Sequence, residues 1–475
     1  MKVVLLNPNT GLDERIENEG AWPPLGLLYL GTVLQKDGHE VKLIDNTRAR
    51  LPVEPVAERV DKENPDVVGI STLTPTFRQA VKLAGAIKKK SPDAKIVFGN
   101  YHATFEYERI LKNCPMVDCV VLGEGEYTFS ELVNAMEKGK KIDDIRGIAF
   151  RSNGKVVRTP PAPAIQDLDK LPFPDRALLE HDYRSEVVGV IGSGGKFTTL
   201  LTSRGCPYGC KYCACAAFSS RKTRFRSPEN VVEEMEMLQG AGYEEVGFVD
   251  DNLLLDKRRV EKICDLLKAH KIKLNLWAEG RADQASREML TKFARAGCKT
   301  IYFGIESSTQ KVLDYYGKNI TPEDSRKAVS NSKKAGIENV IGSFIVGAPI
   351  ETLEDVKQTF DFAMGLQGMD FPQMNVLNLS PGMELWNTAI KDGYLKEDDY
   401  WDVPVAAVNI FPSHMSEKEI TGMVDGFYKE FIKRPSYIVS QLLKTVKSEY
   451  RLRIVLANLR AGTGLGSSLK QLWGG

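Results

Sequence analysis

Three cysteines stand close together in the middle of the chain, in the run Thr202-Ser-Arg-Gly-Cys206-Pro-Tyr-Gly-Cys210-Lys-Tyr-Cys213. Because Gly and Pro interrupt helices and strands, this run predicts a loop that turns three sulfurs toward one point. Three thiolates can hold three irons of a 4Fe–4S cluster and leave the fourth iron without a protein ligand. An open metal position is typical of chemistry, since a structural site uses its full ligand set.

The same cysteines could instead form a structural zinc site or remain buried free thiols. Zinc would need a fourth ligand from a second Cys or His pair, and the sequence offers none at suitable spacing. Cys215 is near in sequence, but two residues after Cys213 we expect it to point away. We therefore predict that Cys206, Cys210 and Cys213 bind a 4Fe–4S cluster.

This motif, with Tyr212 directly before its third cysteine, resembles that of the radical S-adenosylmethionine (SAM) enzymes. The resemblance implies that the open iron binds the amino and carboxylate groups of SAM, with Tyr212 close by. It also implies that an electron from the reduced cluster cleaves SAM to a 5′-deoxyadenosyl radical, which abstracts hydrogen from a substrate. An external donor such as flavodoxin or ferredoxin would supply that electron.

Length and composition limit the class of protein. A chain of 475 residues with 42% hydrophobic and 27% charged residues is typical of a soluble protein of two or three domains. Its 64 basic and 63 acidic residues nearly cancel, which gives no reason to expect nucleic acid or an anionic surface as partner. We expect no integral membrane span and, from the scattered remaining cysteines and the strand-like start, a cytoplasmic location.

Residues 1–140 alternate apolar strands with helical patterns, which predicts a doubly wound, Rossmann-like α/β domain with a parallel sheet. Such a sheet binds ligands at the carboxyl ends of its strands, and four polar loops follow the expected strands. No Gly-x-Gly-x-x-Gly follows the first strand, which disfavours a dinucleotide. The candidate ligand contacts in these loops are Asn9, Thr10, Ser71, Thr72, Leu73, Gly99, Asn100, Tyr101, His102, Gly123, Glu124 and Gly125.

Pro23-Pro-Leu-Gly-Leu-Leu-Tyr, His102 and Gly123-Glu-Gly-Glu together resemble the cobalamin-binding domain that precedes many radical SAM domains. The resemblance covers residues 1–140 and implies that the twelve loop residues contact cobalamin. The signature Asp-x-His-x-x-Gly, whose His coordinates cobalt from below, is missing. We therefore expect His102 to hydrogen-bond within its loop or to touch the corrin edge, not to bind cobalt. Alternatively, the domain has lost its ligand and serves as a scaffold.

Residues 141–195 predict a β-hairpin with its turn at Asn153-Gly154, followed by a Pro-rich connector. In residues 196–390, six strands alternate with helices, which predicts a partial (β/α)6 barrel of the TIM type, open on one side. Chemistry in such barrels lies at the carboxyl ends of the strands, and the cysteine loop follows the first expected strand.

Polar residues end the later barrel strands, where apolar side chains would pack better. The resemblance assigns the residues after the second strand to the SAM amino group, and Arg281 could pair with the SAM carboxylate. Glu306 and Ser307, at the end of the fourth strand, could bind the ribose hydroxyls or the methionine end of SAM. The backbone around Val346, at the end of the fifth strand, could bind the adenine of SAM. Each could instead be a rim ion pair, for instance Arg281 with Glu279 or Glu306. The SAM candidates are Tyr212, Asp250, Asp251, Asn252, Glu279, Arg281, Glu306, Ser307 and Val346.

Residues 391–475 predict a mainly helical region, with helices over Lys418–Lys433 and Ser440–Ala457. Its aromatic residues could form the wall of a substrate pocket or belong to the core. They are Trp401, Phe411, Phe427, Tyr428 and Tyr437.

Taken together, these resemblances imply a cobalamin-dependent radical SAM methyltransferase acting on an unactivated carbon. Such a C–H bond must break homolytically, and the weak cobalt–carbon bond of methylcobalamin can then supply the methyl group. The runner-up is a cobalamin-dependent radical SAM enzyme for oxidation, cyclisation or rearrangement without methylation. A third reading is a non-catalytic sensor, for which the chain offers no basic recognition helix. The substrate class stays open between a small molecule, a lipid and a protein side chain.

Overall fold

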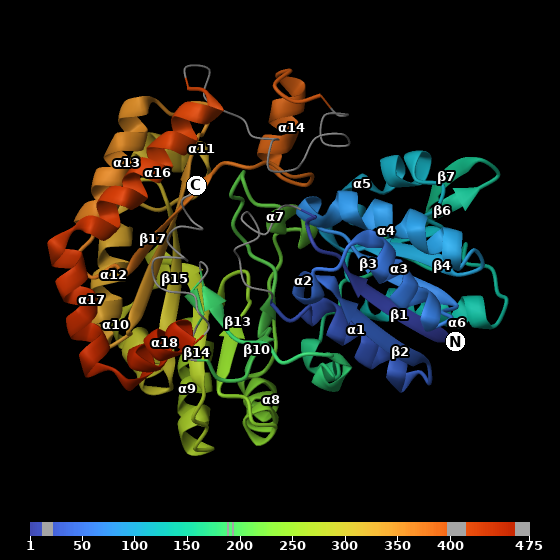
Figure 1. Ribbon diagram of the computed structural model, residues 1–475, viewed down its shortest axis with the longest axis horizontal. Coiled ribbons are helices and arrows are strands. Elements are labelled where there is room, and N and C mark those ends of the chain that lie inside the picture. The colour runs from blue at the N-terminus through green and yellow to red at the C-terminus, as the bar shows by residue number, and fades with distance from the viewer. Residues whose placement is uncertain (12–21, 188–189, 192–193, 397–414, 461–475) are drawn as a thin grey trace.

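The computed structural model describes residues 1–11, 22–187, 190–191, 194–396 and 415–460. They form two large sheets, of seven and six strands, which lie in separate units (Figure 1). Figure 1 shows the N-terminal sheet at the right in blue and the second sheet at the left in green to orange. In the described part of the chain no helix is long and apolar enough to cross a membrane.

The N-terminal sheet has the order β2-β1-β3-β4-β5-β6-β7, in which β1 to β5 are parallel and β6 and β7 run antiparallel. Its strands are β1 (Lys2–Asn7), β2 (Glu40–Asp45), β3 (Val67–Ser71), β4 (Lys95–Gly99), β5 (Cys119–Val121), β6 (Ile148–Ser152) and β7 (Lys155–Arg158). Its helices are α1 (Leu25–Lys36), α2 (Asn46–Ala49), α3 (Val53–Lys62), α4 (Phe77–Lys90), α5 (Asn100–Asn113) and α6 (Glu126–Glu137). The predicted doubly wound fold is confirmed, and its topological switch point, where such sheets bind ligands, lies between β1 and β3.

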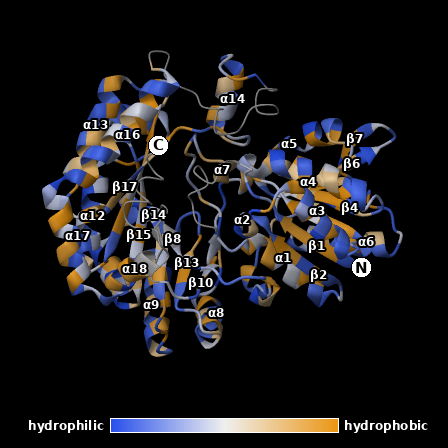
Figure 2. Ribbon diagram, in the orientation of Figure 1, coloured by the Kyte–Doolittle hydropathy of each residue, from blue (hydrophilic) through white to orange (hydrophobic). Residues whose placement is uncertain are grey.

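Two apolar cores cover the two faces of this sheet. One packs strand residues such as Val68 against α3, α4 and α5, and the other packs residues such as Leu5 against α1 and α6. Figure 2 shows these strands as hydrophobic ribbons between mixed helices. Continuous apolar strands form because both faces are buried.

The hairpin expected in residues 141–195 is the pair β6 and β7, and it continues the N-terminal sheet through β5. Asn153 and Gly154 have φ of 49° and 73°, which a two-residue hairpin turn requires. The connector then reaches the second sheet, where Arg176 forms an ion pair of 2.7 Å with Glu234.

The second sheet is entirely parallel in the order β10-β13-β14-β15-β16-β17, and its two end strands do not pair with each other. Its strands are β10 (Phe197–Leu200), β13 (Glu245–Phe248), β14 (Asn275–Arg281), β15 (Cys298–Glu306), β16 (Asn339–Val346) and β17 (Phe371–Val376). Its helices are α8 (Pro228–Gly240), α9 (Lys257–Ala269), α10 (Arg287–Arg295), α11 (Gln310–Tyr315), α12 (Pro322–Ala335), α13 (Leu353–Gly365) and α14 (Glu384–Lys391). This confirms the predicted partial (β/α)6 barrel.

The C-terminal region is mainly helical, as predicted, and its described residues form α16 (Glu417–Lys433), α17 (Pro435–Lys447) and α18 (Glu449–Arg460). Phe427 and Tyr428 belong to the barrel core, and Tyr437 packs against that core and donates to the Asp370 carbonyl at 2.9 Å. These three aromatic residues therefore pack in the core and do not form the wall of a substrate pocket. Trp401 and Phe411 lie outside the described residues.

Two sequence expectations about local structure are wrong. The Gly99–Thr104 stretch was expected to be a loop, but α5 begins at Asn100, directly after β4. Asn100 takes the left-handed conformation at φ 80°, which lets the chain turn from strand to helix without a longer loop. The single helix expected over Ser440–Ala457 is divided at Ser448, whose extended backbone separates α17 from α18.

Candidate active site

The cysteine loop leaves the carboxyl end of β10 and is closed at its base by a short antiparallel pair, β11 (Ser203–Arg204) and β12 (Arg224–Phe225). Gly205 begins the loop at φ 89°, and a Cβ there would lie 2.1 Å from the Lys222 carbonyl oxygen. A larger residue at this position would therefore push the loop off its base.

Two aspartates after β13 hold the start of this loop. Asp250 is buried and accepts hydrogen bonds from the backbone and side chain of Thr202 and from the Ser203 hydroxyl. Asp251 accepts from the Gly205 backbone N–H at 2.8 Å. The carboxylates after β13 thus position the loop, whatever else they bind.

The three cysteine thiols lie near one another. Burial raises the pKa of Cys206 and raises that of Cys213 to about 11, and the charge of Cys210 adds to both shifts. Among the described residues, no three His, Cys, Asp or Glu side chains converge as ligands of a single ion. The three thiols of Cys-x3-Cys-x2-Cys are the donor set for a 4Fe–4S cluster, and binding a cluster would release their protons. Cys215 is buried at the start of α7 (Cys215–Phe218), beside Ser219.

A cavity of about 520 Å³ opens beside the cysteine loop at the carboxyl ends of the barrel strands. Five of the predicted SAM residues line it: Tyr212, Asp251, Glu279, Arg281 and Glu306. It also exposes polar residues that the sequence reasoning missed, namely Tyr302, Lys318, Ser343, Asn375 and Asn378. The geometry thus joins residues from β13 to β17 around one space.

A buried three-membered network lies on the wall of this cavity. Glu306 Oε1 accepts from the Tyr212 hydroxyl at 2.8 Å and from Lys318 Nζ at 2.7 Å. Glu306 is 4% exposed and stands at φ 67°, a strained conformation for a side chain of this size. Gly304 leaves room for the pair, because a Cβ there would meet Glu306 Oε1 at 2.5 Å. Burial and the Glu306 charge hold the pKa of Tyr212 well above its usual value.

Arg281 contacts the cysteine loop. It pairs with Asp283 at 3.1 Å and donates to the Lys318 carbonyl at 2.8 Å. Its guanidinium lies 3.7 Å from the centre of the Tyr208 ring and 4.0 Å from Cys210 Sγ. The rim pair considered with Glu279 or Glu306 is therefore replaced by one with Asp283.

The other predicted SAM residues lie behind the cavity. The Ser307 hydroxyl is buried against Thr309 and Thr359, and Val346 is fully buried at the end of β16. Asn252 is 1% exposed, and both polar atoms of its side chain lack a hydrogen-bond partner among the described residues. Buried side-chain amides are rarely left without a hydrogen-bond partner.

The loops predicted to contact a ligand in the N-terminal unit meet at one edge, because β1, β3, β4 and β5 are adjacent and parallel. Asn9 and Thr10 follow β1, and the Ser71 hydroxyl accepts from Asn100 at 2.9 Å. Thr72 donates to the Gly99 carbonyl at 2.7 Å, which joins the ends of β3 and β4.

This edge faces the cysteine loop. The Tyr101 ring stacks on Phe218 of α7 with ring centres 4.1 Å apart. Burial, Asp251 and the two nearby cysteines raise the pKa of Tyr101 strongly, which places its hydroxyl near the cysteine loop. The two units therefore present their candidate loops to each other.

Charged side chains fasten the same junction. Glu124, which is expected to contact a ligand, pairs with Arg204 at 3.0 Å and with Arg224 at 2.8 Å on the strands below the cysteine loop. Arg204 also pairs with Glu126 at the start of α6. The carboxylates hold the pKa of Arg204 above its usual value despite its burial. Gly125 ends the same loop and packs near Leu30.

Comparison with known proteins decides the family. Family models match residues 15–133 as a B12 binding domain and residues 200–363 as the radical SAM superfamily. The chain is 33% identical over 446 residues to an uncharacterized methyltransferase of Pyrococcus horikoshii, covering 94% of this chain and 95% of that protein. The chain belongs to the cobalamin-binding radical SAM enzymes.

Other similar proteins differ in reaction. An anaerobic magnesium-protoporphyrin IX monomethyl ester cyclase of Rubrivivax gelatinosus is 31% identical over 373 residues, which cover 76% of this chain and 65% of that protein. The solved structure of OxsB, a cobalamin-dependent SAM radical enzyme, matches with a TM-score of 0.72 at 17% identity, covering 99% of this chain and 74% of that one. The solved structure of the methyltransferase TsrM from Kitasatospora setae matches with a TM-score of 0.67 at 22% identity, covering 82% of this chain and 75% of that one. At such identities these two structures show the fold.

The residues of this cobalamin-binding radical SAM enzyme fit its cofactors. Three thiols in a Gly-rich loop are the donor set for a 4Fe–4S cluster, and the polar cavity beside them suits SAM. At the opposite edge Leu73 exposes 42% of its side chain, and a Cβ on Gly123 would meet nothing within 4 Å. An apolar contact and open backbone are what a corrin ring needs.

His102 is held inside the N-terminal unit. Its ring stacks on the Phe77 ring with ring centres 4.1 Å apart, and its Nδ1 lies 3.1 Å from the Thr74 hydroxyl oxygen. Burial lowers the pKa of His102 to about 3, so the ring is neutral. The expected hydrogen bond near its loop is present.

Proposed function

We propose that this enzyme is a cobalamin-dependent radical SAM methyltransferase that methylates an unactivated carbon. The observation that carries the proposal is the contact of Tyr101 with Phe218, where the carboxyl edges of both sheets approach. A relative named as a methyltransferase matches 94% of this chain and 95% of its own length, which supports methyl transfer as the reaction. A substrate held at this junction would be close to both cofactor sites.

When bound, the cluster and SAM would supply a hydrogen-abstracting radical, and cobalamin would supply the methyl group. Cys206, Cys210 and Cys213 would hold the cluster. Glu306, Tyr212 and Lys318 would fix the orientation of SAM in the cavity, because their mutual hydrogen bonds limit their rotamers. Arg281 would place a positive charge beside Cys210.

The cobalamin contacts we propose are Asn9, Thr10, Leu73 and Gly123 in the loops after β1, β3 and β5, with Asn100 and Tyr101 at the start of α5. Glu124 acts differently, as the residue that fastens the N-terminal unit to the strands below the cysteine loop. Flavodoxin or ferredoxin would serve as the external electron donor.

The test is anaerobic turnover of the reconstituted enzyme with SAM, cobalamin and a reductant across candidate substrates. Methylation of an unactivated carbon would consume two SAM molecules, one as the source of the radical and one as the source of the methyl group, so we expect both 5′-deoxyadenosine and S-adenosylhomocysteine. The absence of both products with every substrate would count against the proposal.

A second candidate function is radical cyclisation or oxidation without methylation. It is favoured by the match to the protoporphyrin ester cyclase over 76% of the chain. In that case the same turnover assay yields 5′-deoxyadenosine without S-adenosylhomocysteine.

A further inference from the structure

The helices α17 and α18 expose an apolar surface that no described residue covers. No residue of α17 is buried, and its apolar positions recur at the spacing of one helical face. Exposed fractions range from 42% at Leu456 to 85% at Val446. We call this set the apolar face: Ile438, Val439, Leu442, Leu443, Val446, Leu452 and Leu456. Clustered exposure of this kind marks an interaction surface.

The apolar face lies far from the candidate active site. Figure 1 places α17, in red, at the outer edge of the barrel on the side away from the N-terminal sheet. The cavity beside the cysteine loop has no lining residue from α17 or α18.

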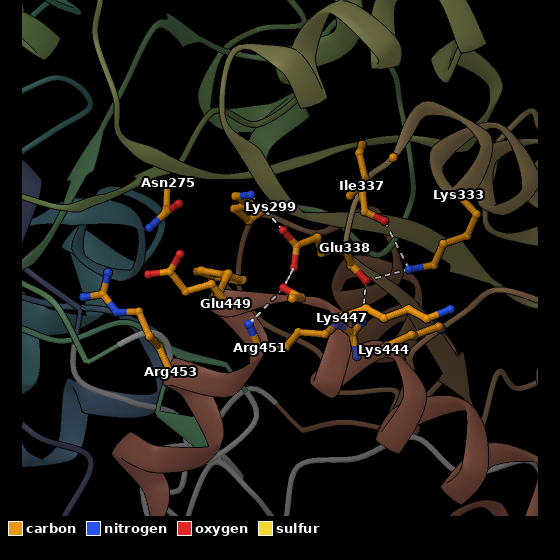
Figure 3. Close-up of a pocket in the computed structure, with 13 residues that line it drawn as sticks. Asn275, Lys299, Lys333, Ile337, Glu338, Lys444, Lys447, Glu449, Arg451 and Arg453 are labelled. Carbon is orange, nitrogen blue, oxygen red and sulfur yellow. Dashed lines mark hydrogen bonds and ion pairs between the residues drawn. The ribbon is translucent and has the colours of Figure 1, made fainter.

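A basic cavity of about 650 Å³ adjoins the apolar face, between the end of α17 and the start of α18 (Figure 3). Its cationic lining residues are Lys299, Lys333, Lys444, Lys447, Arg451 and Arg453, against the two acids Glu338 and Glu449. Behind it the single carboxylate of Asp370 pairs with Lys333, Lys444 and Arg451. Lys447 has no ion pair or hydrogen bond with any described residue and stands next to Val446.

Arg453 also pairs with Glu244 at 2.6 Å. The six lining cations still outnumber the four carboxylates of Glu338, Glu449, Asp370 and Glu244, so positive charge is in excess around this cavity. Burial, together with the nearby cations Lys444 and Arg451, lowers the pKa of Lys333 to about 8 in spite of its pair with Asp370. The sequence carries the same bias, since residues 433–475 contain eight Lys or Arg and one Glu, while the whole chain has a net charge of +1. The balanced total conceals a basic C-terminal segment.

We propose that α17 and α18 dock this enzyme on an anionic membrane surface. The apolar face enters the boundary between headgroups and acyl chains, and the basic cavity receives the phosphate of an anionic lipid headgroup. Apolar side chains beside cationic ones on a surface helix are the features that bind a helix in the plane of a membrane. The helices lie on the membrane, because no described helix is long and apolar enough to span it.

Other occupants fit less well. A nucleic acid would use the positive charge but leave the apolar face in water. A second copy of the chain would cover the apolar face, but a two-fold interface would bring two equally basic cavities toward each other. An anionic bilayer satisfies both features at once.

The experiment uses the full-length reconstituted enzyme and sedimentation with lipid vesicles. We expect binding to vesicles that contain phosphatidylglycerol, weaker binding at high salt, and no binding to phosphatidylcholine alone. Because one Lys near such a surface contributes about 1 kcal/mol, Lys447→Ser should lower the partition coefficient about fivefold. The double change Leu442→Ser with Val446→Ser should lower it more than tenfold, as an estimate from the lost apolar contact of about 1.5 kcal/mol or more.

Matched controls come from the rest of the surface. Met237 on α8 is 57% exposed and Lys62 at the end of α3 is exposed, so Met237→Ser and Lys62→Ser make the same chemical changes elsewhere. Both should bind vesicles like the unmodified enzyme. All substituted side chains are exposed, so the fold should survive, and circular dichroism checks this.

Several results would overturn the proposal. One is equal binding to neutral and anionic vesicles, and another is full binding by the Leu442→Ser, Val446→Ser double variant. A third is light scattering that reveals a dimer which this variant dissociates, with no vesicle binding by the unmodified enzyme. Salt-sensitive binding to RNA without vesicle binding would equally contradict it.

Discussion

Replacing Lys318 by Met tests the network proposed to orient SAM. Lys318 Nζ lies 2.7 Å from Glu306, and the two side chains are only 8% and 5% exposed. Removing one partner of a buried pair leaves a buried charge uncompensated, which costs about 3–5 kcal/mol. The Tyr212 hydroxyl still donates to Glu306, so we expect the lower end of that range.

The matched control is Lys257→Met, which breaks an ion pair of 2.8 Å with Glu288 whose side chains are 46% and 72% exposed. The chemical change and the distance are nearly the same, but solvent screens this pair, so we expect a much smaller loss of stability than in Lys318→Met. Adding Glu306→Gln to Lys318→Met removes the orphaned charge and should recover part of the stability.

The assay is urea unfolding of the apo chain followed by tryptophan fluorescence. Among the described residues, Trp277 and Trp386 lie in the barrel, and Trp22 packs on Trp277 with ring centres 4.6 Å apart. These three tryptophans therefore report on the barrel and not on the N-terminal sheet. SAM cleavage should also fall in Lys318→Met, because Glu306 lines the cavity. If Lys318→Met unfolds at the same urea concentration as Lys257→Met and cleaves SAM normally, the reasoning is refuted.

Three further predictions concern the cluster, the junction and the C-terminal helices. Cys210→Ala should abolish the brown iron–sulfur absorbance, whereas Cys215→Ala should keep it; the reverse result would reassign the ligands. Phe218→Ala removes the stack on Tyr101 and should lower S-adenosylhomocysteine formation more than 5′-deoxyadenosine formation, and an unchanged ratio would contradict this. Burial alone would raise the pKa of Asp370, but Lys333, Arg451 and Lys444 lower it from 3.8 to about 2. Since the pKa of Asp370 is lower in the folded state, this carboxylate contributes about 2 kcal/mol of stability above pH 3.8, which is lost as the pH falls toward 2. In acid unfolding, the Asp370→Asn variant should therefore lose less stability over this pH range than the unmodified chain, and an equal loss would contradict the prediction.

The sequence predicts those parts of the site that follow from local pattern. Gly and Pro around the cysteines indicate a loop, and parallel strands bring their carboxyl ends to one edge. Residues at or near strand ends, such as Asp251 after β13 and Glu306 at the end of β15, therefore line the cavity.

Lys318 could not be found in this way. It follows the short helix α11 and the turn at Gly317, well past any strand end. Only the fold brings it to Glu306 on β15. The one available signal was a Gly-Lys pair after a helix, which is common on protein surfaces.

Glu124 illustrates a different difficulty. Its place in Gly123-Glu-Gly-Glu fits a ligand loop, but its partners Arg204 and Arg224 stand 80 and 100 residues further along the chain. Contacts between units depend on docking, which local periodicity does not encode. Similarly, the net charge of the whole chain conceals the basic C-terminal segment.

The most direct test of the central claim is the cofactor content of one preparation of the full chain, reconstituted anaerobically with iron, sulfide and cobalamin and then passed through gel filtration. The account predicts that the chain keeps both a corrinoid spectrum and about four irons, and that Cys206→Ala loses the iron but keeps the corrinoid. A chain that retains neither cofactor would contradict it.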